Sequence, residues 1–126
     1  MRVRMFMINQ IRKPWDNLES KLRRKGGIIR SIDESLIDSS EYDLVYDGEW
    51  NEQSDIDDVF LTLGEYLYKK TEGVACAAAT DVIYVDGSAS NEEGYYFCLS
   101  MGWQKIAFDE SQTSRNILAT YKDVFS

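Results

Sequence analysis

Apolar residues recur along the chain with two different spacings, and these spacings predict its strands and helices. Residues 2–8 (RVRMFMI) alternate between small or linear apolar side chains and charged or aromatic ones, which is typical of a strand. The short segments 28–32 (IIRSI) and 42–46 (YDLVY) are further strand candidates. Between residues 28 and 40 the pattern does not separate strand from loop.

Two helices are predicted in the first part of the chain. The first begins at Pro14, whose missing N–H costs nothing in a first helical turn, and ends at Gly26. Its apolar side carries Trp15, Leu18 and Leu22. The second spans about 55–70, where Ser54 and Asp57 match the spacing of a capping box, with Asp in place of the usual Glu. Its apolar stripe consists of Ile56, Val59, Phe60, Leu63 and Leu67.

The rest of the chain predicts strands, a loop and a last helix. Residues 74–85 (VACAAATDVIYV) are typical of a buried strand, and the alanines suggest that another element approaches it closely. Residues 86–94 (DGSASNEEG) form a predicted loop, and the segments 95–100 (YYFCLS) and 103–108 (WQKIAF) a hairpin. A terminal helix that starts near Ser111 is expected to bury Ile117, Leu118, Tyr121 and Phe125.

This order of elements predicts an α+β fold, because strands and helices do not alternate regularly. We expect a mostly antiparallel mixed sheet with about three helices packed on one face. The length of 126 residues fits a single globular domain that spans residues 1–126.

Composition favours a cytoplasmic protein. No apolar run approaches the roughly 20 residues that span a bilayer, and the apolar part of the N-terminal segment, Met5 to Ile8, is shorter than the roughly 7–15 residues of a signal-peptide core. Cys76 and Cys98 both lie in apolar segments, so we expect buried free thiols in a reducing compartment. A disulfide between them stays open, since it requires that their two strands be neighbours.

Charge is sorted along the chain. The net charge of −8 combines +7 for residues 1–30, −12 for residues 31–68 and −3 for residues 69–126. Residues 31–68 contain no Lys or Arg at all. A single acidic stretch therefore dominates the electrostatics of the protein.

The residue types present exclude several kinds of catalysis. The chain has no histidine, which removes Ser-His-Asp and Cys-His mechanisms and histidine-ligated metals, and it has no Gly-rich phosphate loop. We predict no metal, no cofactor and no enzymatic activity. The remaining enzymatic alternatives use carboxylates: Asp55 with Asp57 as a metal-binding pair, or Asp86 with Glu92 and Glu93. Acids in a first helical turn and at a solvated loop tip explain these groups more simply.

The segment 48–60 (GEWNEQSDIDDVF) gathers carboxylates around one tryptophan. Strand alternation puts Tyr42, Leu44 and Tyr46 on one face, and Glu41, Asp43 and Asp47 on the other. Strand, turn and helix start would then form one anionic surface, with Trp50 as an aromatic anchor, although a core position for Trp50 fits the sequence equally well. The predicted partner-binding residues are Asp43, Tyr46, Asp47, Glu49, Trp50, Glu52, Asp55 and Asp58.

Two simpler explanations of the acidic stretch stay open. The acids could serve only to keep the protein soluble, since charge runs are usually solvated faces. Alternatively, the basic segment 1–30 could pair with them, either within the chain or across a homodimer interface.

An anionic surface with aromatic residues suits a cationic protein partner. Phosphates of nucleic acids and of anionic membranes would be repelled, so neither is expected as a partner. A basic cleft such as a nuclease active site would be attracted, and its association would be accelerated by steering. We therefore expect an inhibitor or bacterial immunity protein that neutralises a basic toxin, in particular a nuclease, by occluding its active site. The alternative is an acidic structural or chaperone-like module, such as a secretion chaperone or an assembly protein.

Overall fold

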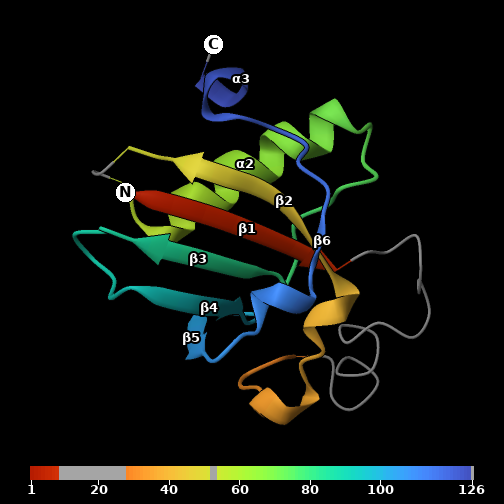
Figure 1. The fold of residues 1–126 in the computed structure, drawn as a ribbon, viewed down its shortest axis with the longest axis vertical. Helices are drawn as coiled ribbons and strands as arrows, with labels where there is room; N and C mark the ends of the chain where they lie inside the picture. Colours follow the sequence, from red (N-terminus) through yellow and green to blue (C-terminus); the bar gives the residue numbers. More distant parts are fainter. Residues whose placement is uncertain (9–27, 52–53, 126) are drawn as a thin grey trace.

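A six-stranded mixed sheet forms the centre of the fold (Figure 1). The computed structural model describes residues 1–8, 28–51 and 54–125. The strand order is β5-β4-β3-β1-β2-β6, and all neighbours pair antiparallel except β2 and β6, which are parallel. The strands are β1 (Arg2–Ile8), β2 (Tyr42–Glu49), β3 (Val82–Asp86), β4 (Gly94–Cys98), β5 (Trp103–Ile106) and β6 (Ser114–Arg115). The predicted α+β class and mostly antiparallel mixed sheet are confirmed.

The described residues contain fewer helices than predicted. They form two α-helices, α2 (Ile56–Lys70) and α3 (Tyr121–Phe125). Three short 3-10 turns complete the inventory, η1 (Glu34–Leu36), η2 (Ser39–Glu41) and η3 (Glu110–Gln112). The helix predicted between Pro14 and Gly26 lies outside the described residues.

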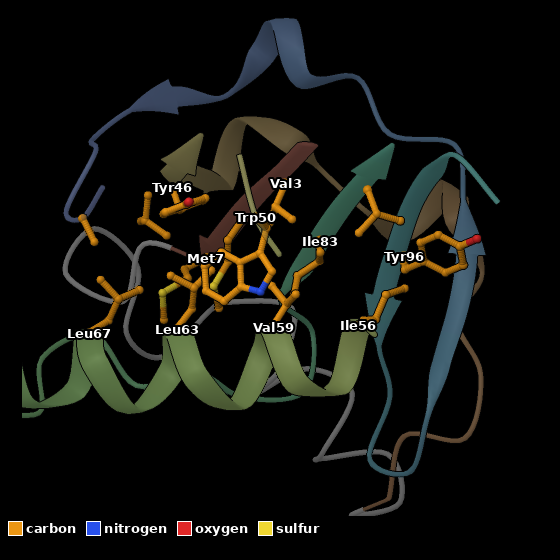
Figure 2. Close-up of a cluster of buried hydrophobic side chains, with 14 of the residues drawn as sticks. Val3, Met7, Tyr46, Trp50, Ile56, Val59, Leu63, Leu67, Ile83 and Tyr96 are labelled. Carbon is orange, nitrogen blue, oxygen red and sulfur yellow. The ribbon is translucent and has the colours of Figure 1, made fainter. Parts of the chain in front are cut away.

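Helix α2 packs on one face of the sheet, as its apolar stripe predicts. Its N-cap is Asp55 and not the predicted Ser54, because the Asp55 carboxylate accepts the backbone N–H of Asp58 at 2.8 Å. The stripe of α2 meets side chains from β1, β2, β3 and β4 in the first core cluster (Figure 2). The buried members of this cluster include Val3, Met5, Met7, Tyr46, Trp50, Ile56, Val59, Leu63, Leu67, Ile83, Val85 and Tyr96.

The opposite face of the sheet is covered by irregular chain. Residues 28–32, a strand candidate, form no strand here, but Ile29 and Ile32 are buried in a second core cluster. The backbone of Ile32 is instead satisfied by the Gln104 side chain of β5, with hydrogen bonds of 3.0 and 2.9 Å. Other buried members of the second cluster are Phe6, Ile8, Tyr42, Leu44, Val82, Phe97 and Ile106.

The segment before β3 is shorter in strand than predicted. Strand β3 begins only at Val82, since Thr80 adopts a φ of +84° and the Asp81 carboxylate accepts the backbone N–H of Ala78, which together form a turn. Cys76 in this segment is exposed, which corrects the expectation of two buried thiols, and Cys98 is buried and free. The expected close approach is real: a Cβ built on Gly64 of α2 would lie 2.8 Å from the Cβ of Ala77.

The predicted hairpin of β4 and β5 and the loop between β3 and β4 are both confirmed. The predicted helix from Ser111 is mostly wrong, because residues 114–118 extend along the edge of β2. Asn116 and Leu118 donate their backbone N–H groups to Leu44 and Val45, each at 2.9 Å. This pairing replaces the hydrogen bonds that a helix would have made, and the chain becomes helical only at Tyr121. Tyr121 and Phe125, which were expected in the core, are 40% and 51% exposed.

Candidate functional site

A β-bulge in β2 separates the acids that the sequence placed on one surface. Met5 pairs with Tyr46 but the next residue, Phe6, pairs with Leu44, so Val45 has no partner in β1. The alternation of side chains between the two faces of the sheet is therefore interrupted at Val45. Tyr42 and Leu44 belong to the second core cluster, whereas Tyr46 belongs to the first.

The bulge sends Asp43 to the side of the sheet that carries α2, where it is buried. Asp43 lines a recess of about 220 Å³ with Met7, Thr71, Cys76 and Asn116, among others. Burial removes this predicted contact residue from the outer surface.

Asp47 lies on the opposite face, between two arginines of β1. Its Oδ1 accepts hydrogen bonds from Arg2 at 2.8 and 3.1 Å and from Arg4 at 3.2 Å. Burial alone would raise the pKa of the Asp47 carboxyl, but these hydrogen bonds and charges outweigh it and hold the pKa below its usual value. Asp47 therefore pairs with basic residues of the N-terminal segment within the chain, which is one of the two simpler explanations of the acidic stretch.

The same arginines continue into an aromatic layer on this face. Arg4 bonds Glu110 at 2.6 Å and lies over the ring of Tyr84 at 5.1 Å. The ring of Tyr84 packs against that of Tyr95, with centroids 4.9 Å apart and the planes tilted by 48°. Burial and the hydrogen bond to Glu110 raise the pKa of Tyr95 to about 12, so its hydroxyl stays protonated at neutral pH. The charged groups of this layer therefore pair with each other: Arg2 and Arg4 with Asp47, and Arg4 with Glu110.

The two aromatic residues expected to anchor a partner belong to the core. Trp50 is 4% exposed and meets the ring of Tyr46 at 5.5 Å (Figure 2). Its ring also meets those of Tyr121 at 5.9 Å and Phe125 at 5.1 Å. Tyr46 is fully buried and donates its hydroxyl to the carbonyl of Glu49 at 2.6 Å. Because α3 folds over it, the Trp50 ring is closed off from a partner.

Acids from three separate segments remain at one end of the sheet. In the ladder, Arg2 at the start of β1 is opposite Glu49 at the end of β2 and Asp86 at the end of β3. Helix α2 starts at this same end, and so does the loop between β3 and β4 (Figure 1). We call this set the acidic end, and it consists of Glu49, Asp55, Asp57, Asp58, Asp86, Glu92 and Glu93.

Local contacts offset little of this charge. Glu49 is 3.6 Å from Arg2, which is already engaged by Asp47, and Glu92 is 3.0 Å from Lys105. Both contacts are exposed at the surface, where ion pairs are weak. Predicted residue Glu52 lies outside the described residues.

The loop acids of the acidic end are far in sequence from the segment 48–60. The sequence predicts Asp86, Glu92 and Glu93 as a solvated loop tip or as an enzymatic alternative, and not as part of the same surface. Their neighbours in space follow from strand register, since β2 and β3 both pair antiparallel with β1 and so end together. That register cannot be read from the local pattern of either segment.

The described residues offer little for chemistry. They contain no group of three or more Cys, Asp and Glu side chains arranged to hold a metal ion. Burial, aided by Asp81 and Asp57, raises the pKa of the Cys98 thiol to about 12, which opposes a nucleophilic role. Within the described ranges, neither helix is long and apolar enough to cross a membrane.

Comparison with known protein families, with curated proteins and with solved structures gives no match.

Proposed function

We propose that this protein is an inhibitor or immunity protein that binds a cationic toxin, in particular a nuclease, and occludes its active site. The observation that carries the proposal is the acidic end, where seven carboxylates from three segments share one end of the sheet with three cationic groups, Arg2, Lys105 and the N-terminal amine of Met1. Like charges held together by a fold cost stability, so a surface that keeps them suits a partner that neutralises them.

The sign and placement of the charge define the partner. Carboxylates repel the phosphates of nucleic acids and of anionic lipids, so we propose neither as a ligand. A cleft built to bind nucleic acid is rich in Lys and Arg and offers the complementary potential. A protein of this kind would act in the cytoplasm, before the toxin reaches nucleic acid there.

The proposal is tested by association kinetics with a toxin domain encoded in the reading frame next to this one. A triple variant with Glu49→Gln, Asp58→Asn and Asp86→Asn removes three exposed charges from the acidic end. We expect its association rate at low salt to fall about 10-fold and its salt dependence to flatten, with a smaller change in dissociation.

A matched control changes the same charge elsewhere. Asp33, Asp38 and Asp109 each cap a 3-10 turn, a role that Asn also fulfils. The triple Asn variant at these positions should associate at the wild-type rate. If both triple variants associate equally slowly, the net charge of the protein sets the rate and not the acidic end. If neither variant changes the association kinetics, the proposal is wrong.

The rival is an acidic structural or chaperone-like module. Such a module would form a stable complex with an effector segment and would leave nuclease activity unchanged. Inhibition of toxin turnover at equimolar ratio therefore separates the two functions.

We also propose that the protein uses no cofactor and catalyses no reaction itself. Assays for hydrolase, transferase and nuclease turnover, with and without Mg²⁺, should give none. Metal-dependent turnover that is lost with Asp55→Asn or Glu93→Gln would contradict this.

A further inference from the structure

The outer face of α2 carries two large apolar side chains in solvent. Leu61 is 67% exposed and Tyr68 is 54% exposed. They are seven residues apart, so they lie on the same side of the helix, two turns from each other. The stripe that packs into the core lies on the other side, at Val59, Leu63 and Leu67.

The ring of Tyr68 is held in place by the backbone that follows α2. Its ring lies against Gly73, where a Cβ would come within 3.4 Å of two ring carbons. Gly73 adopts a φ of +87°, a conformation that glycine allows at low cost. A ring held in this way loses little side-chain freedom when a partner covers it.

Carboxylates flank the two apolar side chains on both sides. At 100° per residue, Asp57 lies on one side of the line through Leu61 and Tyr68, and Asp58 and Glu65 lie on the other. Lys69 pairs with Glu65 at 2.9 Å, but both side chains are exposed, so the pair offsets little of the charge. An apolar ridge with an acidic rim is the pattern of a helix that fits a groove.

We propose that the outer face of α2 is the specificity-determining part of the interface, and that it docks into an apolar groove rimmed by Lys or Arg on a partner protein. This inference rests on the proposed function and adds the apolar anchor that the buried Trp50 does not provide. A second copy of the chain is disfavoured as the occupant, since it would bring the same carboxylates face to face.

The test uses two synthetic peptides of equal charge: an amphipathic Leu–Lys helix and a Lys–Ser peptide without leucine. The Leu–Lys peptide should bind the wild-type protein more tightly, and its NMR shift changes should centre on residues 57–68. Leu61→Ser and Tyr68→Ser should each weaken it about 10-fold. Neither should change binding of the Lys–Ser peptide, which reports charge alone.

Met101→Ser is the matched control, since Met101 is 89% exposed in the β4–β5 turn and is not part of α2. Circular dichroism checks that each variant is folded. Equal loss with Met101→Ser, shift changes outside residues 57–68, or a homodimer that Leu61→Ser dissociates would overturn the inference. If both peptides bind and neither Leu61→Ser nor Tyr68→Ser changes their affinity, this inference is wrong but the proposed function is not. Failure of both peptides to bind wild type removes the cationic partner itself.

Discussion

Replacement of Trp50 by alanine should damage the fold and not a binding surface. The ring is 4% exposed and meets three aromatic neighbours. A buried tryptophan removes about 200 Å² from water, which at about 25 cal/mol per Å² corresponds to about 5 kcal/mol. Alanine keeps a small part of this, so we expect a loss of about 3–5 kcal/mol in the free energy of unfolding.

A loss of this size is a large fraction of the roughly 5–15 kcal/mol that stabilises a typical domain. Urea unfolding followed by circular dichroism at 222 nm measures it without relying on tryptophan fluorescence. Trp50→Phe keeps an aromatic ring against Tyr46 and Phe125 and should lose about half as much. If Trp50→Ala instead lost less than about 1 kcal/mol, α3 would not cover the ring and the core assignment of Trp50 would be wrong.

Three further predictions concern stability and reactivity. The pKa of Asp47 is held below 3.8, so the folded protein binds fewer protons than the unfolded chain; unfolding free energy should fall as the pH drops below about 4, and Asp47→Asn should reduce that fall. Gly64→Ala should destabilise by about 1 kcal/mol in urea unfolding despite its better helix propensity, and Ala77→Gly in the same chain should restore most of the loss. Cys76 should react with a thiol reagent in the native protein at pH 8, whereas Cys98 should react only on unfolding; equal rates would place both thiols at the surface.

Elements with an uninterrupted local pattern could be predicted from the sequence. Strand β1, helix α2 and the β4–β5 hairpin each follow one period from end to end, and their own residues supply the buried face. The segment 114–118 could not be predicted, because its hydrogen-bond partners Leu44 and Val45 lie about 70 residues earlier in the chain. In this segment, hydrogen bonding to the edge of a strand that is distant in sequence outweighs the local propensity to form a helix.

The candidate site divides in the same way. Exposed acids at the start of α2 follow from the cap and the apolar stripe, so Asp55 and Asp58 were correctly placed outside the core. The faces on which Asp43 and Asp47 lie depend on the β-bulge at Val45, and no residue near Val45 predicts a bulge. Strict alternation therefore predicted one surface where the fold has two.

The unpaired Val45 also decides how β2 would respond to a change in its length. Val45 and Tyr46 both contribute to the core cluster under α2, whereas Leu44 belongs to the opposite face. Removing Val45 would make Leu44 and Tyr46 consecutive, opposite Phe6 and Met5, so both would keep their present faces and Asp47 would stay beside Arg2 and Arg4. Removing one residue of β2 outside this bulge would instead turn the side chains on one side of the deletion to the other face. Strand β2 should therefore tolerate the loss of one residue at the bulge, where only the contacts of Val45 disappear, and resist the same loss elsewhere.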